Sequence, residues 1–183
     1  MSTERIASHS AKKEMEEMAN DDAKKQTRLA ALLRVYGVLT LLIFGLLFVG
    51  FAIQTPLLAD EPRGALNWLI WNGIRCGSEP CYVHPMLFII HLVWGVFFFL
   101  AAREPLAYVS FLSFTMWAYL FHGLLMSVQA LTHIDTQWHR FFMDIPYELI
   151  LALGIYLWRP ASSEERAQAQ VDAHSQSEIL LVF

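Results

Sequence analysis

The fold of this protein is decided by the uncharged segment LAYVSFLSFTMWAYLFHGLLMSVQAL, residues Leu106–Leu131. A membrane-spanning helix needs about 20 consecutive apolar residues, so this segment is long enough to cross a bilayer. Two further uncharged segments, Val35–Ile53 and Met86–Ala102, precede it in the chain. The sequence therefore predicts at least three membrane-spanning helices.

A fourth span is less complete. The apolar segment Leu149–Trp158 is too short to cross a bilayer alone. It becomes long enough only if the helix starts near Phe141, which draws Asp144 and Glu148 into the membrane. The alternative is a short re-entrant segment. We expect a span, because four crossings return both tails to the same side.

Composition excludes ordinary soluble domains, disordered chains and disulfide-dense secreted domains. Of the 183 residues, 56% are hydrophobic and 16% are charged, whereas a typical soluble domain is roughly 45–50% apolar and about 25% charged. The charge is concentrated in an N-terminal tail, 1–34, and a C-terminal tail, 159–183, around a transmembrane domain, 35–158. The formal net charge of -4 offers no basic surface to nucleic acid. The first predicted partner is therefore the lipid bilayer.

Positive charge predicts the orientation, because loops rich in lysine and arginine stay in the cytoplasm. The basic residues near span ends on one side are Lys24, Lys25, Arg28, Arg34, Arg103, Arg159 and Arg166. Those on the other side are Arg63, Arg75 and Arg140. We therefore expect a multi-pass protein of the bacterial inner membrane with both termini in the cytoplasm and loops 54–84 and 132–140 outside. The N-terminal tail is unlike a cleavable signal peptide, because its charged stretch is long and contains many acidic residues.

The two cysteines agree with this orientation. Cys76 and Cys81 both lie in the predicted outer loop, where Gly77 and Pro80 favour a tight turn. An oxidising periplasm permits a disulfide between them. Two unpaired thiols are one alternative. A redox role is another, although the spacing differs from CxxC and no third cysteine could resolve a mixed disulfide.

Three segments outside the spans are predicted to lie on surfaces. Residues Ala11–Arg34 contain no glycine or proline and mix charges of both signs, which favours a helix running into the first span. Ala65–Ile74 carries Trp68 and Trp71, which favours an outer interfacial helix. The C-terminal tail ends in the apolar segment Ile179–Phe183, which needs a surface to cover it. We expect the tails to dock membrane protein partners.

Polar side chains inside the predicted spans suggest a function, because intramembrane polar groups are costly. On the third span four of them fall within roughly 60° of one another on a helix. This polar stripe consists of His122, Met126, Gln129 and His133. Asp144 and Glu148 share a face of the fourth segment, and His91 lies on the second span. By helical rise His91 and His122 lie about 9 and 13 Å below the outer surface, where a four-helix bundle would bring these groups together.

Four interpretations of these polar residues remain open. The simplest is interhelical packing, with His122, Gln129 and Asp144 forming hydrogen bonds across helices. The second is a metal site for zinc, iron or manganese, or for copper with Met126. Its candidate ligands are His122, Gln129, His133, Asp144 and Glu148. The third is a haem or chlorin with His91 or His122 as its axial ligand among aromatic side chains, and with Met126 as a further cofactor-binding candidate. The fourth is a proton or quinone path through the histidines and carboxylates.

Four short motifs follow one another in the second half of the chain. They are Arg103-Glu104-Pro105-Leu106-Ala107, Phe114-Thr115-x-Trp117, His122-x-x-x-Met126-x-x-Gln129-Ala130 and Asp144-x-Pro146. With these motifs the segment Leu87–Trp158 resembles a family of small four-span bacterial membrane proteins of unknown function. The resemblance implies a four-span fold in a membrane and no activity. The family pattern stresses the positions of His122, Met126, Gln129 and Asp144, and it does not require His91 or Glu148.

The sequence thus predicts an all-α integral membrane protein. Its four transmembrane helices form a bundle, with a cytoplasmic N-terminal amphipathic helix and an outer interfacial helix. No Gly-rich phosphate loop and no nucleophile motif occurs in the chain. We expect a non-catalytic accessory subunit or binding module of a larger membrane assembly. The alternative is a membrane redox protein or enzyme that binds metal, haem or pigment at the histidine, methionine and carboxylate residues.

Overall fold

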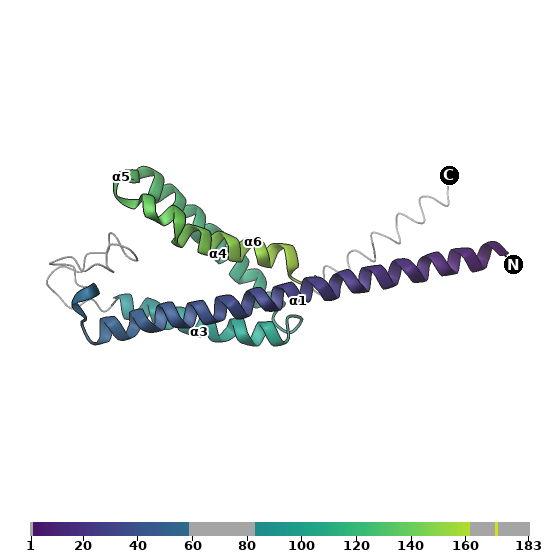
Figure 1. Cartoon of the computed structure of the whole chain (residues 1–183), viewed down its shortest axis with the longest axis horizontal. Coiled ribbons are helices and arrows are strands. Elements are labelled where there is room, and N and C mark those ends of the chain that lie inside the picture. Colours follow the sequence, from purple (N-terminus) through teal and green to yellow (C-terminus); the bar gives the residue numbers. More distant parts are fainter. Residues whose placement is uncertain (1, 59–82, 162–170, 172–183) are drawn as a thin grey trace.

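The computed structural model of the chain is all-α over the residues that it describes, which are 2–58, 83–161 and 171. Its side chains are described for residues 13, 16–58, 86–161 and 171. The elements, in order, are α1 (Ser2–Ala52), η1 (Pro56–Leu58), α3 (Val83–Arg103), α4 (Val109–Thr132), α5 (Ile134–Gln137), η2 (Trp138–Phe142) and α6 (Asp144–Trp158) (Figure 1). No strand occurs in the three described stretches.

Three helices are long and apolar enough to cross a membrane. They are Glu16–Ala52 within α1, Met86–Arg103 within α3, and Val109–Thr132, which is α4. The second and third match the uncharged segments of the sequence apart from a few residues at the ends, whereas the first contains nearly all of Val35–Ile53 and also the charged segment 16–34 before it. The helix α4 starts at Val109 rather than at Leu106, because Pro105 opens a turn in which the N–H of Tyr108 donates to the Pro105 carbonyl (3.3 Å). Hydropathy alone therefore predicted that these three segments are helices.

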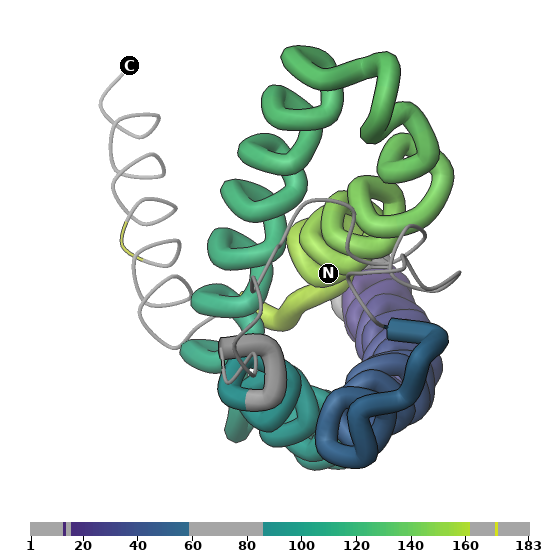
Figure 2. Tube along the Cα trace, turned by 90° about the vertical axis from the view of Figure 1, so that its left-hand side faces the viewer, coloured from purple at the N-terminus to yellow at the C-terminus, as the bar shows by residue number. Residues whose placement is uncertain are grey.

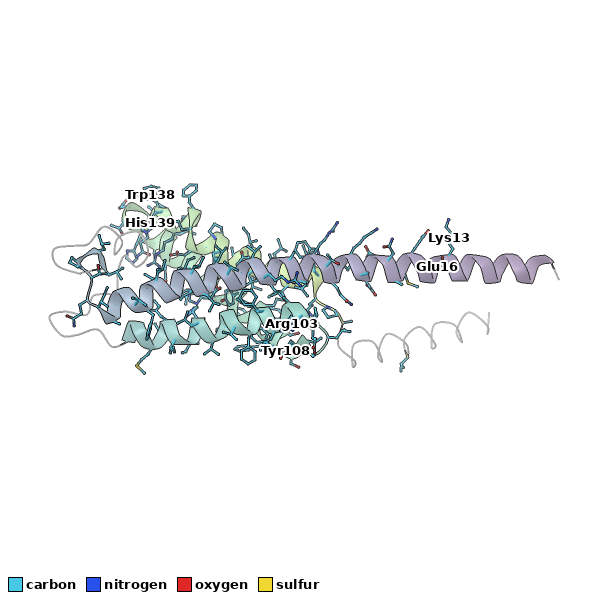
Figure 3. The ribbon with its side chains drawn as sticks, turned by 60° about the horizontal axis from the view of Figure 1, so that its bottom comes forward. Lys13, Glu16, Arg103, Tyr108, Trp138 and His139 are labelled. Atoms are coloured by element: carbon cyan, nitrogen blue, oxygen red, sulfur yellow. The ribbon has the colours of Figure 1, made fainter. Side chains whose placement is uncertain are left out.

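The N-terminal half of α1 projects beyond the other helices as a charged stem (Figures 1 and 3). The 51 residues of α1 correspond to about 77 Å at 1.5 Å per residue. Residues 16–25 are all exposed, so no other part of the described chain covers them. Lys25 forms an ion pair with Asp21 (2.8 Å) and lowers the pKa of that carboxyl, while Asp21 raises the pKa of Lys25. The helix expected over 11–34 is confirmed, and its docking to a partner stays a prediction.

Helices α1 and α3 form an antiparallel hairpin held close by glycines. A Cβ added at Gly37 would lie 2.8 Å from Cε2 of Phe99, and one added at Gly95 would lie 3.0 Å from the side chain of Leu41. Small residues let helix backbones approach in a membrane, where close packing rather than the hydrophobic effect drives association. The close approach of α1 and α3 therefore depends on glycine, which has no side chain, at positions 37 and 95.

The fourth apolar segment is broken rather than continuous. The helix expected to start near Phe141 starts at Asp144 instead, and the preceding segment Ile134–Phe142 meets it at 42°. Pro146 explains the break, because it has no N–H to donate to the carbonyl of Phe142 and fits only the first turn of a helix. By length and composition the bent pair is a broken span or a re-entrant loop, so the structure has three candidate spans or up to four.

Helix α6 runs back along α4 and ends against α1. A Cβ added at Gly123 of α4 would lie 2.8 Å from the Leu149 side chain of α6. Further along α6, Gly154 faces the Leu32 side chain of α1. The second hairpin, α4 with α6, is therefore joined to the first hairpin by the packing of α6 on α1.

The two hairpins meet at one end only. The larger buried core takes side chains from all four helices, for example Leu33, Phe98, Met116 and Leu151. Among the described residues, the smaller core consists of Leu47, Leu58 and Phe88, from α1, η1 and α3. Figures 1 and 2 show the α4–α6 hairpin diverging from the α1–α3 hairpin toward α5. We call the end near Arg103 and Trp158 the closed end and the end near α5 the open end.

Candidate functional site

The inner faces of the helices change from apolar to polar toward the open end. On the closed side the buried inner side chains are Leu29, Leu33, Leu112, Met116, Leu151 and Ile155. The next side chains along the same faces are Tyr36, Thr40, Trp94, Thr115, Tyr119 and Tyr147, which we call the polar layer. The polar layer therefore lies where the four-helix core ends and the two hairpins part.

Hydrogen bonds in the polar layer tie the two hairpins together. The hydroxyl of Tyr36 donates to the backbone carbonyl of Tyr147 (3.0 Å), and the hydroxyls of Thr40 and Tyr147 lie 2.5 Å apart. These bonds join α1 to α6. The indole N–H of Trp94 donates to the hydroxyl of Thr115 (2.9 Å), which joins α3 to α4. Each hairpin is thus bonded to the other through two pairs of helices.

One hydroxyl of the polar layer is left unmet. Tyr119 is 4% exposed, and its hydroxyl has no hydrogen-bond partner among the residues that the structure describes. Its ring packs edge-on against Trp94 (5.5 Å between centroids) and lies 6.4 Å from the ring of Tyr147. A buried polar group without a partner costs about 1–3 kcal/mol. The Tyr119 hydroxyl is therefore a buried group whose hydrogen-bonding capacity is unused within the described residues.

Glu148 stands at the edge of the polar layer. It is half-buried and follows the apolar inner face of α6, two turns from Ile155. A Cβ added at Gly123 would lie 3.1 Å from the Cβ of Glu148, so Glu148 packs against the backbone of α4. Its carboxyl is within electrostatic range of the hydroxyls of Tyr36 and Tyr119. Asp144, one turn nearer the open end, is its charged neighbour.

The polar stripe of α4 is exposed. His122, Gln129 and His133 are exposed, and Met126 is half-buried. Thr115 lies two turns before His122 at nearly the same helical angle, and it is bonded to α3. The stripe therefore continues the α3-facing line of α4 beyond the point where the two helices separate. Within the described ranges none of its side chains forms a hydrogen bond or an ion pair.

The structure brings only some of the predicted site residues together. His91 of α3 stacks on Phe44 (4.1 Å between centroids), and its Nδ1 is hydrogen-bonded to the carbonyl of Leu87 (2.8 Å). It is within electrostatic range of His122, as is Arg140. Asp144 and Glu148 sit together on α6, whereas Gln129 and His133 lie further along α4 toward the open end.

A metal centre does not assemble in the described part of the chain, where no three side chains of histidine, cysteine, aspartate or glutamate are grouped to hold an ion. The proposed ligand set around His122 and Glu148 is therefore spread along two helices, because α4 diverges from its neighbours. The haem or chlorin interpretation stays a prediction. The predicted disulfide Cys76–Cys81, the outer helix Ala65–Ile74 and the apolar end Ile179–Phe183 lie outside the described residues.

Sequence reasoning missed the tyrosines of the site. Tyrosine in a membrane protein is usually assigned to the interfacial belt, and Tyr36, Tyr119 and Tyr147 are not among the residues that the sequence predicted for the site. The spacing of two of these tyrosines from other polar residues could have identified them. Tyr36 and Thr40 are four residues apart in the uncharged segment Val35–Ile53, and Tyr119 precedes His122 by three, so each pair shares a face.

Comparison with known families shows the family to which the chain belongs. A family model described as a family of unknown function (DUF6632) matches residues 25–174. No curated protein and no solved structure matches the chain. The chain therefore belongs to the DUF6632 family of unknown function, in agreement with the resemblance noted from its motifs.

Proposed function

We propose that this member of the family is a non-catalytic accessory subunit that binds a helix of a larger membrane assembly between its two hairpins. The observation that supports it is the exposed polar stripe of α4, which has no hydrogen-bonding partner among the described residues. Lipid chains offer no hydrogen bonds, so such side chains are costly unless another protein meets them. Polar side chains that bond across helices are a common basis of helix association in membranes.

The other exposed faces of α4 support the same conclusion. Around the helix from the stripe, the exposed side chains are apolar: Phe121 (63% exposed), Leu125 (59%) and Val128 (58%). That face suits lipid. The stripe, with His122 and Gln129, is the exception on an otherwise lipid-compatible helix, and it faces the space into which α3 no longer reaches. A partner helix there would contact the stripe on one side and α3 on the other.

The proposed topology has four spans in a bacterial inner membrane, with the bent pair counted as one span and both termini in the cytoplasm. Arg34 and Arg103 lie at the same end, because α1 and α3 are antiparallel with Gly37 against Phe99. Figure 3 labels Arg103 at this closed end, and Arg159 follows the last residue of α6. The concentration of positive charge there supports a cytoplasmic closed end.

Position-specific photo-crosslinking in native membranes tests the proposal. A photoreactive amino acid is placed at Gln129, on the polar stripe. In a control it is placed at Val128, the preceding residue, which lies at nearly the same depth but on the face that suits lipid. We expect an adduct with another polypeptide from position 129 and none from position 128. Equal yields from both positions, or adducts with lipid alone, would overturn the proposal. An adduct of twice the chain mass of 21.0 kDa would replace it by a homodimer.

A further inference from the structure

Glu148 is an intramembrane carboxylate without a cation. No ion pair of Glu148 occurs in the part of the chain that the structure describes, and its charged neighbour is another carboxylate, Asp144. The nearest arginine in sequence, Arg140, interacts with Asp144 and with His122. Ionisable groups at such depth normally pair with a group of opposite charge or face a functional partner. The missing cation is therefore expected from outside the described chain.

The Tyr119 hydroxyl is a second, independent sign of a missing ligand. It is buried and unmet, and Tyr119 lies one helical turn before Gly123, which packs against Glu148. A lysine ammonium carries three donors and an arginine guanidinium five. One such cation therefore has enough donors for both the Glu148 carboxylate and the Tyr119 oxygen. A neutral apolar helix would leave both groups unmet.

Depth constrains the partner. Gly123 packs directly on Glu148 and Leu149, about 13 Å from the open end of α4 at 1.5 Å per residue. A basic side chain of the partner must reach this level from a helix that lies along the polar stripe. Since an unpaired cation at that depth is itself costly, each protein would cover the unpaired charge of the other.

We infer that the helix bound between the hairpins carries one intramembrane lysine or arginine, whose cation binds between Glu148 and Tyr119. The inference rests on the proposed function and names the chemistry of its partner. Glu148 is then a positioning residue for assembly, since its charge selects which helix is accepted. Removing that charge would remove selectivity for a basic helix without unfolding the closed end, where the core is apolar.

A designed membrane-spanning peptide tests this selectivity on the full chain. The host peptide is leucine and alanine throughout, without tryptophan, and carries one lysine about 13 Å from one end. Matched peptides carry leucine or glutamine at that position. Binding in phosphatidylcholine vesicles is measured by energy transfer from the chain's tryptophans to a dansyl group on the peptide. We expect the lysine peptide to bind about tenfold more tightly than the leucine peptide, as a charged hydrogen bond implies.

Variants of the chain then show which residues cause the preference for the lysine peptide. Glu148→Gln should abolish it, Tyr119→Phe should reduce it, and the control Glu104→Gln, on the exposed turn before α4, should leave it intact. Equal binding of all three peptides to the wild-type chain would overturn the inference, whatever the variants do. So would a lysine preference that appears only after Arg63→Gln and Arg75→Gln, because the chain's own loop would then supply the cation.

The two proposals fail separately. If the peptides bind equally while the adduct from position 129 persists, the partner helix exists and its basic residue does not. If the lysine preference holds while position 129 yields no protein adduct, the cation site exists and the accessory-subunit proposal is wrong.

Discussion

Replacing Tyr147 with phenylalanine should loosen α6 from α1 at the polar layer. The change removes one hydroxyl, which lies 2.5 Å from that of Thr40. It keeps the ring, whose centroid lies 4.8 Å from that of Tyr36. It also keeps the bond from the Tyr36 hydroxyl to the backbone carbonyl of residue 147 (3.0 Å). The variant therefore isolates one hydrogen bond between two helices.

The magnitude follows from burial and from the membrane setting. Thr40 is 0% exposed, so water cannot replace the lost partner. Interhelical hydrogen bonds in membrane proteins average about 0.6 kcal/mol and reach about 1.7 kcal/mol, and an unmet buried hydroxyl costs about 1–3 kcal/mol. Because a threonine hydroxyl can also turn back to a carbonyl of its own helix, we expect Tyr147→Phe to lower the free energy of unfolding by about 1 kcal/mol.

Reversible unfolding in mixed micelles, followed by circular dichroism, measures this free energy. Thr40→Val should cost about as much as Tyr147→Phe, and the double variant should cost little more than either, which gives a coupling energy of about 1 kcal/mol. Tyr156→Phe is the matched control, because Tyr156 lies on the same helix and is 67% exposed. Strictly additive effects of the two changes, or an equal loss in Tyr156→Phe, would refute the reasoning.

Three further predictions concern packing, topology and cofactors. Gly123→Leu should destabilise the α4–α6 hairpin by about 1–3 kcal/mol in the same assay, because its Cβ alone would lie 2.8 Å from Leu149, whereas Gly45→Ala, whose nearest neighbour is 3.7 Å away, should change little. After mild reduction, an impermeant maleimide should label Cys76 and Cys81 from the periplasmic side; labelling from the cytoplasmic side alone would reverse the topology. Finally, the accessory-subunit proposal predicts no stoichiometric metal and no visible absorption band in the purified protein, and a band lost in His122→Gln would favour the redox alternative.

Hydropathy predicted most of the helices, because an apolar segment long enough to cross a bilayer is recognisable from local sequence alone. The uncharged segments Val35–Ile53 and Met86–Ala102 needed no tertiary information to be assigned as helices. The start of the fourth segment was missed, although Pro146 stood in the sequence and marks a first turn. The apolar residues around Pro146 favoured a longer helix that starts near Phe141.

The candidate site was predictable in part. Helical spacing placed His122 and Gln129 on one face, and α4 carries them so. The sequence could not show that this face is exposed, because the divergence of the hairpins depends on how far the core extends between them. The sequence predicted a closed bundle, in which a metal centre joining His133 to Glu148 was one of four open interpretations. The unmet hydroxyl of Tyr119 could be recognised only from its surroundings.

The divergence of the hairpins is measurable as one distance. Spin labels are placed at Met86 on α3 and Leu131 on α4, which are 66% and 65% exposed, in a chain whose two native cysteines are replaced by serine. A control pair at Leu100 and Ser110 reports the closed end of the same two helices. In lipid nanodiscs without a partner, we predict a longer distance for the open-end pair than for the closed-end pair. Equal distances, typical of helices packed about 8–10 Å apart along their length, would bury the polar stripe within the chain and leave no surface for a partner helix.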